Sequence, residues 1–176
     1  MTPEEIYDRY GEKMFHYAAL RLGSLEDTED VLQETFARLS RYAIRWSFIR
    51  NPKAFVFKVL RNETNRFLRG KISRPSTVGF DILNEHQSDC PIGENANPAF
   101  SLQTAIADSP GETLSVKAAT ALSSLPDEQR EVVILKIFQG MSFKEIAAVC
   151  GLSINTAASR YRYALEKLRT ELGREG

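Results

Sequence analysis

Apolar residues recur every three or four positions along two separate stretches of the chain, which is the spacing of one face of an α-helix. The first stretch covers residues 6–67 and divides into at least three helices. The pair Asn51-Pro52, a capping residue followed by the residue favoured at a first helical position, marks where the third helix begins. The second stretch starts near residue 114 and divides into four shorter helical segments. Apolar and polar residues do not alternate long enough for a strand, so the pattern predicts an all-α fold.

Helical spacing stops between the two stretches, where Pro, Gly, Ser and Asn are frequent. We therefore expect two small helical domains, one over residues 1–74 and one over residues 114–176, joined by an irregular linker over residues 75–113. The linker contains six acidic and no basic side chains. It is therefore an acidic strip between the two domains.

The formal net charge of zero hides a strong segregation of charge along the chain. Residues 1–34 contain nine acidic and three basic side chains, whereas residues 35–74 contain eleven basic side chains and the single acid Glu63. A block with this excess of positive charge favours a polyanionic partner, although such blocks are often only solvated surface.

Several function classes are disfavoured by what the sequence contains. No apolar run of about 18 residues is present to span a membrane, and the first residues are acidic where a secretory signal is basic, so we expect a cytoplasmic protein without membrane insertion. Two cysteines and two histidines are too few for a zinc site, and we expect no metal and no cofactor. An enzyme acting on nucleic acid needs clustered carboxylates or a nucleophile with a base, and neither is recognisable.

Residues 151–169, GLSINTAASRYRYALEKLR, predict a helix whose first turn contains no acidic residue. A capping box at Ser142 and Glu145, the small residue Ala147 and a turn at Gly151 precede it, which is the pattern of a helix-turn-helix. Glu145 occupies the free amides at the start of its own helix. The next helix has no acidic residue at its start, so its free amides and the positive end of its dipole remain available to a phosphate.

The polar side chains of that last helix are expected to contact DNA in the major groove. They are Ser153, Asn155, Thr156, Ser159, Arg160, Arg162 and Tyr163. The alternative is an ordinary surface helix of a helical bundle, because this spacing alone also occurs in such helices. The opposite face, which includes Ala157, Ala164 and Leu165, is expected to be buried.

Basic and aromatic residues are interleaved in the loop over residues 41–53, RYAIRWSFIRNPK. Cations hold phosphates and flat rings stack on bases, which is what binding of unpaired DNA requires. Trp46 is equally suited to the core of the domain. The expected contact residues in this loop and the helix after it are Arg41, Tyr42, Arg45, Trp46, Arg61, Asn62, Asn65, Arg66 and Arg69.

An acidic and polar strip is expected on the second helix of the first domain. Asp30, Gln33, Glu34 and Ala37 lie on the helix face opposite the apolar residues, so they are presented outward to a partner. A solvated face with no partner is the alternative.

Three segments together resemble the bacterial RNA polymerase sigma factors of the compact extracytoplasmic-function type, group four. The segments are EDVLQETFARL from residue 29, AFVFKVLRNETNRFLR from residue 54 and SSLPDEQREVVILKIFQGMSFKEIAAVCGLSINTAASRYRYALEKLR from residue 123. The resemblance covers both domains in the order of that family and leaves out the linker. At residues 155–160 the chain reads Asn-Thr-Ala-Ala-Ser-Arg where the family usually has Gly-Thr-Val-Lys-Ser-Arg, and Arg66 replaces a usual aspartate.

The resemblance implies a transcription initiation factor, not an enzyme, whose partners are core RNA polymerase and promoter DNA, with an anti-sigma protein as a further candidate. It implies that the strip of Asp30, Gln33, Glu34 and Ala37 binds polymerase, that the basic loop and helix capture the melted promoter element, that the linker lies in the active-centre channel, and that the last helix reads the upstream element. A stand-alone helix-turn-helix regulator of duplex DNA is the alternative, but it accounts for nothing before residue 114.

Overall fold

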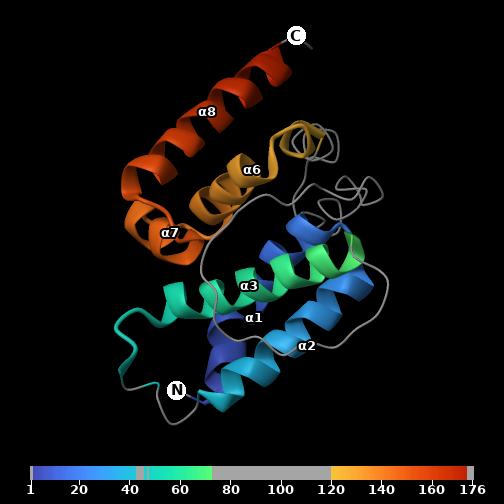
Figure 1. Cartoon of the computed structure of the whole chain (residues 1–176), viewed down its shortest axis with the longest axis vertical. Coiled ribbons are helices and arrows are strands. Elements are labelled where there is room, and N and C mark those ends of the chain that lie inside the picture. Colours follow the sequence, from blue (N-terminus) through green and yellow to red (C-terminus); the bar gives the residue numbers. More distant parts are fainter. Residues whose placement is uncertain (1, 43–45, 47, 73–119, 174–176) are drawn as a thin grey trace.

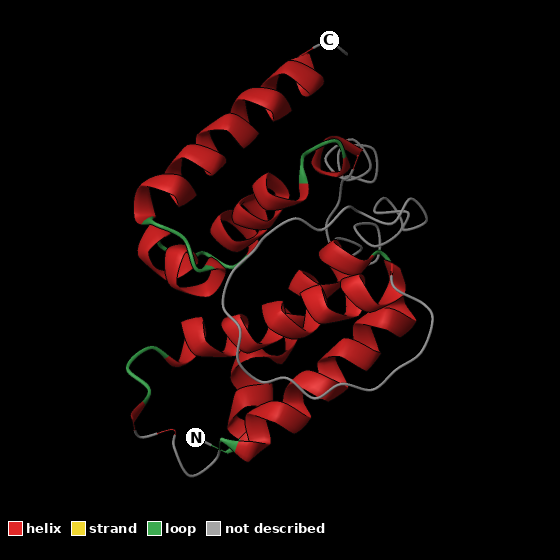
Figure 2. Ribbon diagram, in the orientation of Figure 1, coloured by secondary structure: helices red, strands yellow, loops and turns green. Residues whose placement is uncertain are grey.

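The computed structural model describes residues 2–42, 46, 48–72 and 120–173, and every regular element in this part of the chain is helical (Figures 1 and 2). The elements are α1 (Pro3–Leu22), α2 (Leu25–Arg41), α3 (Pro52–Ile72), α6 (Asp127–Val133), the π-helix η2 (Ile134–Phe138), α7 (Phe143–Cys150) and α8 (Ile154–Gly173). The predicted all-α fold is therefore confirmed. The acidic linker predicted over residues 75–113 lies outside the described residues.

The helices of the first domain begin and end at local signals in the sequence. Thr2 and Glu5 form a capping box at the start of α1, which is worth about 1 kcal/mol for the capping side chain. Gly23 ends that helix with φ 69°, a left-handed conformation that glycine adopts without strain. Asn51 caps α3, since its Oδ1 accepts the Ala54 N–H at 3.0 Å. The predicted start of the third helix is confirmed.

The first domain is built around side chains from all three of its helices. Helix α2 packs against α1 and α3, and the most deeply buried large residues here are Ile6, Met14, Tyr17, Leu39, Phe57 and Leu60. The ring of Tyr17 meets that of Phe57 edge to face at a centroid distance of 5.8 Å. Because α1, α2 and α3 all pack against one another, the surfaces that α2 and α3 present outward have a fixed geometry.

The second domain packs α8 across α6 and α7. Ala157 and Ala164 of α8 are fully buried, as the helical spacing predicts. Leu165 was expected on the same buried face but is 37 % exposed. The small alanines already occupy the contact with α6 and α7, and Leu165 falls at the margin of that contact.

Arg130 of α6 has a structural role in the second domain. Its guanidinium donates hydrogen bonds to the backbone oxygens of Leu122, Ser123 and Leu125, each at 3.0 Å. These carbonyls lie at the end of the helical residues 120–123 and in the turn after them, where the last carbonyls of a helix lack the usual partner four residues on. The Leu122 oxygen also accepts the Leu125 N–H at 3.3 Å. The charged guanidinium of Arg130 therefore caps the C-terminal end of that helix.

The two domains lie against each other in the structure (Figure 1). Helix α3 packs against α7, and α1 packs against η2. One cluster of buried apolar side chains extends through both domains, from Ile6 in α1 to Ala164 in α8. The surfaces that the sequence assigns to DNA are thus held in one arrangement.

Candidate nucleic-acid and polymerase interfaces

The turn between α7 and α8 has the geometry of a helix-turn-helix. Ser142 accepts the Glu145 N–H at 3.3 Å, and the Ser142 N–H donates to the Glu145 carboxylate at 2.8 Å. Hydrogen bonding by the Ser142 backbone holds the pKa of Glu145 below its usual value. Gly151 ends α7 with φ 68°, and the Leu152 N–H donates to the Ala147 oxygen at 2.9 Å. The predicted capping box and glycine turn are confirmed.

Helix α8 begins without any acidic residue in its first turn. Ser153 caps it, because its Oγ accepts the Thr156 N–H at 3.0 Å and lies 2.8 Å from the Thr156 hydroxyl. Asn155, Thr156, Arg162 and Tyr163 are exposed, while Ser159 is half-buried. The positive end of the helix dipole therefore faces solvent beside side chains that can donate and accept hydrogen bonds.

The two arginines expected to contact DNA from α8 differ in their surroundings. Arg160 forms an ion pair with Glu128 of α6, and its side chain is half-buried. Arg162 is exposed, with its guanidinium carbon 5.3 Å from the centroid of the Tyr163 ring. In this arrangement Arg162 is better placed for a phosphate, since Arg160 would have to leave Glu128.

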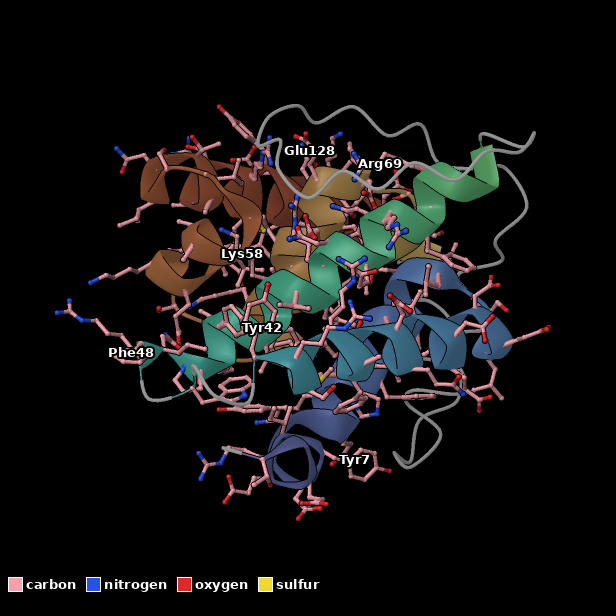
Figure 3. All side chains as sticks on the ribbon, turned by 60° about the horizontal axis from the view of Figure 1, so that its bottom comes forward. Tyr7, Tyr42, Phe48, Lys58, Arg69 and Glu128 are labelled. Carbon is pink, nitrogen blue, oxygen red and sulfur yellow. The ribbon has the colours of Figure 1, made fainter. Side chains whose placement is uncertain are left out.

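The aromatic residues of the loop before α3 divide between surface and core, and Figure 3 shows the two surface rings, Tyr42 and Phe48. Phe48 is 85 % exposed and Tyr42 is also exposed. Trp46, which the sequence placed among the DNA contacts, is only 6 % exposed and meets the Phe55 ring edge to face at 5.5 Å. That assignment is corrected here, because tertiary packing places the ring in the core. Arg45 lies outside the described residues.

Helix α3 presents a basic and amide strip to solvent, and Figure 3 shows Lys58 and Arg69 along it. The exposed members are Lys58, Asn62, Arg66 and Arg69. Arg41, at the end of α2, is exposed as well. Glu63 lies beneath this strip, where burial raises its pKa although Arg38 at 2.9 Å and Arg66 at 3.7 Å pair with it. Lys58 and Arg69 are on the same exposed strip, which therefore keeps a net positive charge toward a polyanion.

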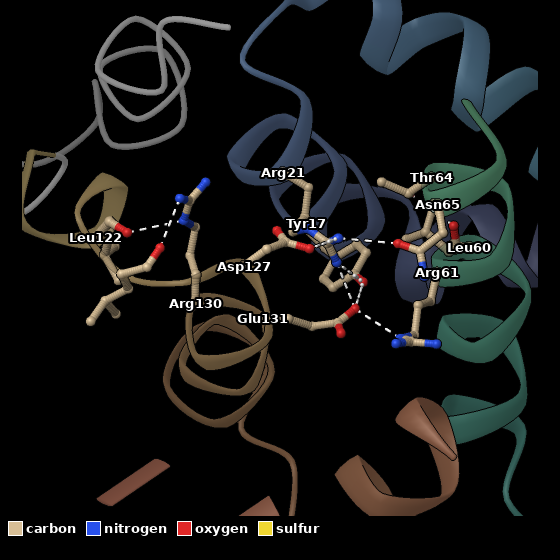
Figure 4. A network of polar contacts seen from close by, with 11 residues as sticks. Tyr17, Arg21, Leu60, Arg61, Thr64, Asn65, Leu122, Asp127, Arg130 and Glu131 are labelled. Atoms are coloured by element: carbon tan, nitrogen blue, oxygen red, sulfur yellow. Dashed lines mark hydrogen bonds and ion pairs between the residues drawn. The ribbon is translucent and has the colours of Figure 1, made fainter. Parts of the chain in front are cut away.

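Arg61 and Asn65, the other two α3 residues assigned to DNA, belong instead to a buried polar cluster formed by α1, α3 and α6 (Figure 4). Arg61 Nε donates to Glu131 Oε1 at 2.9 Å, and Asn65 Oδ1 accepts from Arg21 Nη2 at 3.1 Å. Sequence reasoning missed Arg21 and Glu131 altogether. Helical spacing carried no signal for them, since they lie 110 residues apart.

The strip on α2 expected to bind polymerase is exposed. Asp30, Gln33, Glu34 and Ala37 all face solvent, opposite the buried residues Thr28, Val31, Thr35 and Leu39. Glu34 lies 3.4 Å from Arg38 within the same helix, an exposed pair of little energetic weight. The strip is thus a polar surface with two carboxylates one helical turn apart.

Within residues 2–42, 46, 48–72 and 120–173, no group of three or more His, Cys, Asp or Glu side chains is placed to hold a metal ion. In the same residues, no helix combines the length and apolar character needed to cross a membrane.

Two family models match the chain, one on each domain. The model of sigma-70 region 2 matches residues 6–73, and the model of sigma-70 region 4 matches residues 115–168. Together they cover more than half of the chain, in the order in which the two domains occur.

Curated relatives match over nearly the whole chain. The ECF RNA polymerase sigma factor SigE of Mycolicibacterium smegmatis is 29 % identical over 171 residues, which is 97 % of this chain and 62 % of that protein. The chain thus spans less than two thirds of that relative. The ECF RNA polymerase sigma factor SigW of Bacillus subtilis is 22 % identical over 177 residues, covering 96 % of this chain and 87 % of SigW.

Solved structures share the fold. CnrH, in complex with the cytosolic domain of CnrY, superposes with a TM-score of 0.65 at 22 % identity, covering 99 % of this chain and 89 % of CnrH. The sigma factor RpoE of Bartonella quintana, in complex with the anti-sigma factor NepR, superposes with a TM-score of 0.63 at 21 % identity, covering 97 % of this chain and 96 % of RpoE.

Proposed function

Since the chain belongs to the sigma-70 family, as an RNA polymerase sigma factor of the extracytoplasmic-function type, we propose that it binds core RNA polymerase and directs it to specific promoters. Residues 1–74 bind polymerase and open the promoter, and residues 114–176 read the upstream element. The chain acts in the cytoplasm, where the transcription machinery works, and has no catalytic role of its own.

One observation carries this proposal. Models of two different sigma-70 regions match the two helical domains in order, and each domain exposes a surface suited to its role. A stand-alone helix-turn-helix regulator would explain α7 and α8 but not the match over residues 6–73. Run-off transcription with purified core polymerase separates the two functions, because a regulator does not supply the initiation step.

The melted promoter element is assigned to the exposed strip of α3 and to the loop before it. Support comes from the positive charge of Lys58, Arg66 and Arg69 and from the exposed rings of Tyr42 and Phe48. Cationic side chains beside flat rings suit a single strand, whose phosphates and unpaired bases are both accessible. The upstream element, which remains duplex, is assigned to α8.

One of the two solved complexes indicates a kind of partner for this chain. The anti-sigma factor NepR is bound there to a sigma factor of the same fold. We therefore count a protein of this class among its partners, besides polymerase and promoter DNA.

Replacing Arg162 with alanine is expected to weaken binding of promoter duplex and to reduce the salt dependence of that binding. Each phosphate that a cation neutralises contributes about 0.9 to the slope of log K against log salt, so loss of one contact should lower the slope by roughly one. Titration of a labelled duplex by fluorescence anisotropy at several salt concentrations measures the slope.

The Asn155→Ala variant is the matched comparison, because Asn155 is exposed on the same helix but uncharged. If its amide reads a base, this variant loses sequence preference and keeps the salt slope. An unchanged slope in Arg162→Ala, together with unchanged preference in Asn155→Ala, would place the DNA contacts on another surface.

A further inference from the structure

Arg160 of α8 and Glu128 of α6 form an ion pair beside the helix face assigned to duplex DNA, and Figure 3 shows Glu128 on α6. Arg160 lies three residues after Ala157 and four before Ala164, the two alanines of α8 that are fully buried. Residues three and four apart lie on the same side of a helix. Arg160 is therefore on the side of α8 that meets α6.

Arg162 points in a different direction from Arg160. A helix turns by about 100° per residue, so two positions bring Arg162 to nearly the opposite side of α8. Arg162 is exposed there, and its guanidinium lies over the ring of Tyr163. The Arg160 side chain, in contrast, is half-buried. Of these two arginines, one is free to approach a phosphate and the other is held by a carboxylate.

The charged neighbours of Glu128 on α6 are bound to other groups. Asp127 pairs with Arg21 at 2.8 Å, and Arg130 donates hydrogen bonds to three backbone oxygens. Glu128 itself belongs to the first turn of α6, where the helix dipole favours a negative charge. Asp127 and Arg130 therefore leave the Glu128 carboxylate to Arg160.

Glu128 and a DNA phosphate compete for the Arg160 guanidinium. Both anions offer it a charge-assisted hydrogen bond, so moving from one to the other gains little. The move would also expose the half-buried stem of the arginine. In addition, it would leave Glu128 without its cation near a negatively charged duplex. These losses favour the ion pair over a phosphate contact.

We propose that Glu128 is a specificity-determining residue, which keeps Arg160 from DNA phosphates and so limits how strongly α8 binds duplex DNA of any sequence. Phosphate contacts carry no sequence information, whereas base contacts do. With one cation held back, binding depends more on the hydrogen bonds that α8 makes to bases. The inference rests on the proposed function, which assigns duplex DNA to α8.

The Glu128→Gln variant of the full chain tests this role. Glutamine keeps the shape of the side chain but removes its charge, so Arg160 becomes free to reach a phosphate. We expect the slope of log K against log salt for a random-sequence duplex, measured by fluorescence anisotropy, to become steeper by about 0.9, the contribution of one phosphate. At low salt the affinity for that duplex should rise about tenfold, the gain of one hydrogen bond from a charged group.

Removing an acid also weakens the repulsion of DNA, and two comparisons separate that effect from a new contact. Glu171→Gln removes an exposed acid about three turns further along α8 than Arg160 and should leave the slope unchanged. Arg160→Ala should also keep the slope of the unaltered chain, and adding Glu128→Gln to it should not make the slope steeper. A gain that requires Arg160 identifies a phosphate contact made by that side chain.

An unchanged slope in a Glu128→Gln variant that keeps its helical circular dichroism overturns the proposal, and so does an equal gain without Arg160. A slope that falls by about one in Arg160→Ala alone overturns it as well, because Arg160 would then already contact a phosphate. This last comparison decides the matter if Glu128→Gln does not fold. Run-off transcription by the unaltered chain with core polymerase is measured alongside. A normal transcript with any of these contrary slopes rejects the role of Glu128 alone, whereas no transcript rejects the proposed function.

Discussion

Reversing two charges on α2, in the Asp30→Lys/Glu34→Lys variant, is expected to weaken binding to core RNA polymerase by at least about a hundredfold. Both carboxylates are exposed on one face of the helix, one turn apart. If this face docks on polymerase, the variant places two cations where two anions were complementary, and such like-charge contacts cost several kcal/mol. Anisotropy titration of the labelled protein with purified core enzyme measures the loss.

The Asp8→Lys/Glu12→Lys variant is the control for that experiment. These residues are also an exposed aspartate and glutamate four positions apart, but they lie on α1. The control should bind polymerase normally, and both variants should keep the circular dichroism of a helical protein. Full binding by the α2 variant, or an equal loss of binding in the control, would show that this strip does not contact polymerase.

Reversing two charges on α3, in the Arg66→Glu/Arg69→Glu variant, is expected to reduce promoter opening by about two orders of magnitude while polymerase binding persists. Both arginines are exposed, and a hydrogen bond to a charged group contributes about 1.5–3 kcal/mol, so two lost contacts account for that reduction. Permanganate reactivity of unpaired thymines reports opening on a promoter fragment.

Arg9→Glu/Lys13→Glu makes the same change of charge on α1, at two exposed residues of the same domain. This control should open the promoter as the unaltered chain does. Normal thymine reactivity with the α3 variant would show that the exposed strip does not hold the melted strand.

Helix boundaries could be predicted because their signals are local. The caps at Asn51 and Ser142 involve residues within three positions along the chain, and the left-handed φ of 68° at Gly151 is one that glycine adopts without strain. Such features depend on a few neighbouring residues and can be identified from the sequence alone. The outward faces of α2 and α3 follow in the same way from helical period.

Contacts between distant residues could not be predicted in this way. Glu131 lies 114 residues from Tyr17 and 70 residues from Arg61, and no local pattern indicates which charges will meet. Arg61 was assigned to DNA on its charge and spacing, which are the same whether it faces solvent or a carboxylate. Trp46 was misassigned for the related reason that an aromatic ring suits both base stacking and a core.

The most direct test of the whole account is multiple-round run-off transcription with purified core RNA polymerase on a pooled library of promoter fragments. We expect discrete transcripts that appear only when this chain is added and that start at a shared distance from a common upstream sequence. The Asp30→Lys/Glu34→Lys variant should give none of them, and the Asp8→Lys/Glu12→Lys variant should give them all. The account is contradicted if core enzyme yields the same transcripts with and without the chain. If the chain still binds duplex DNA by itself in that case, it is a stand-alone regulator and not an initiation factor.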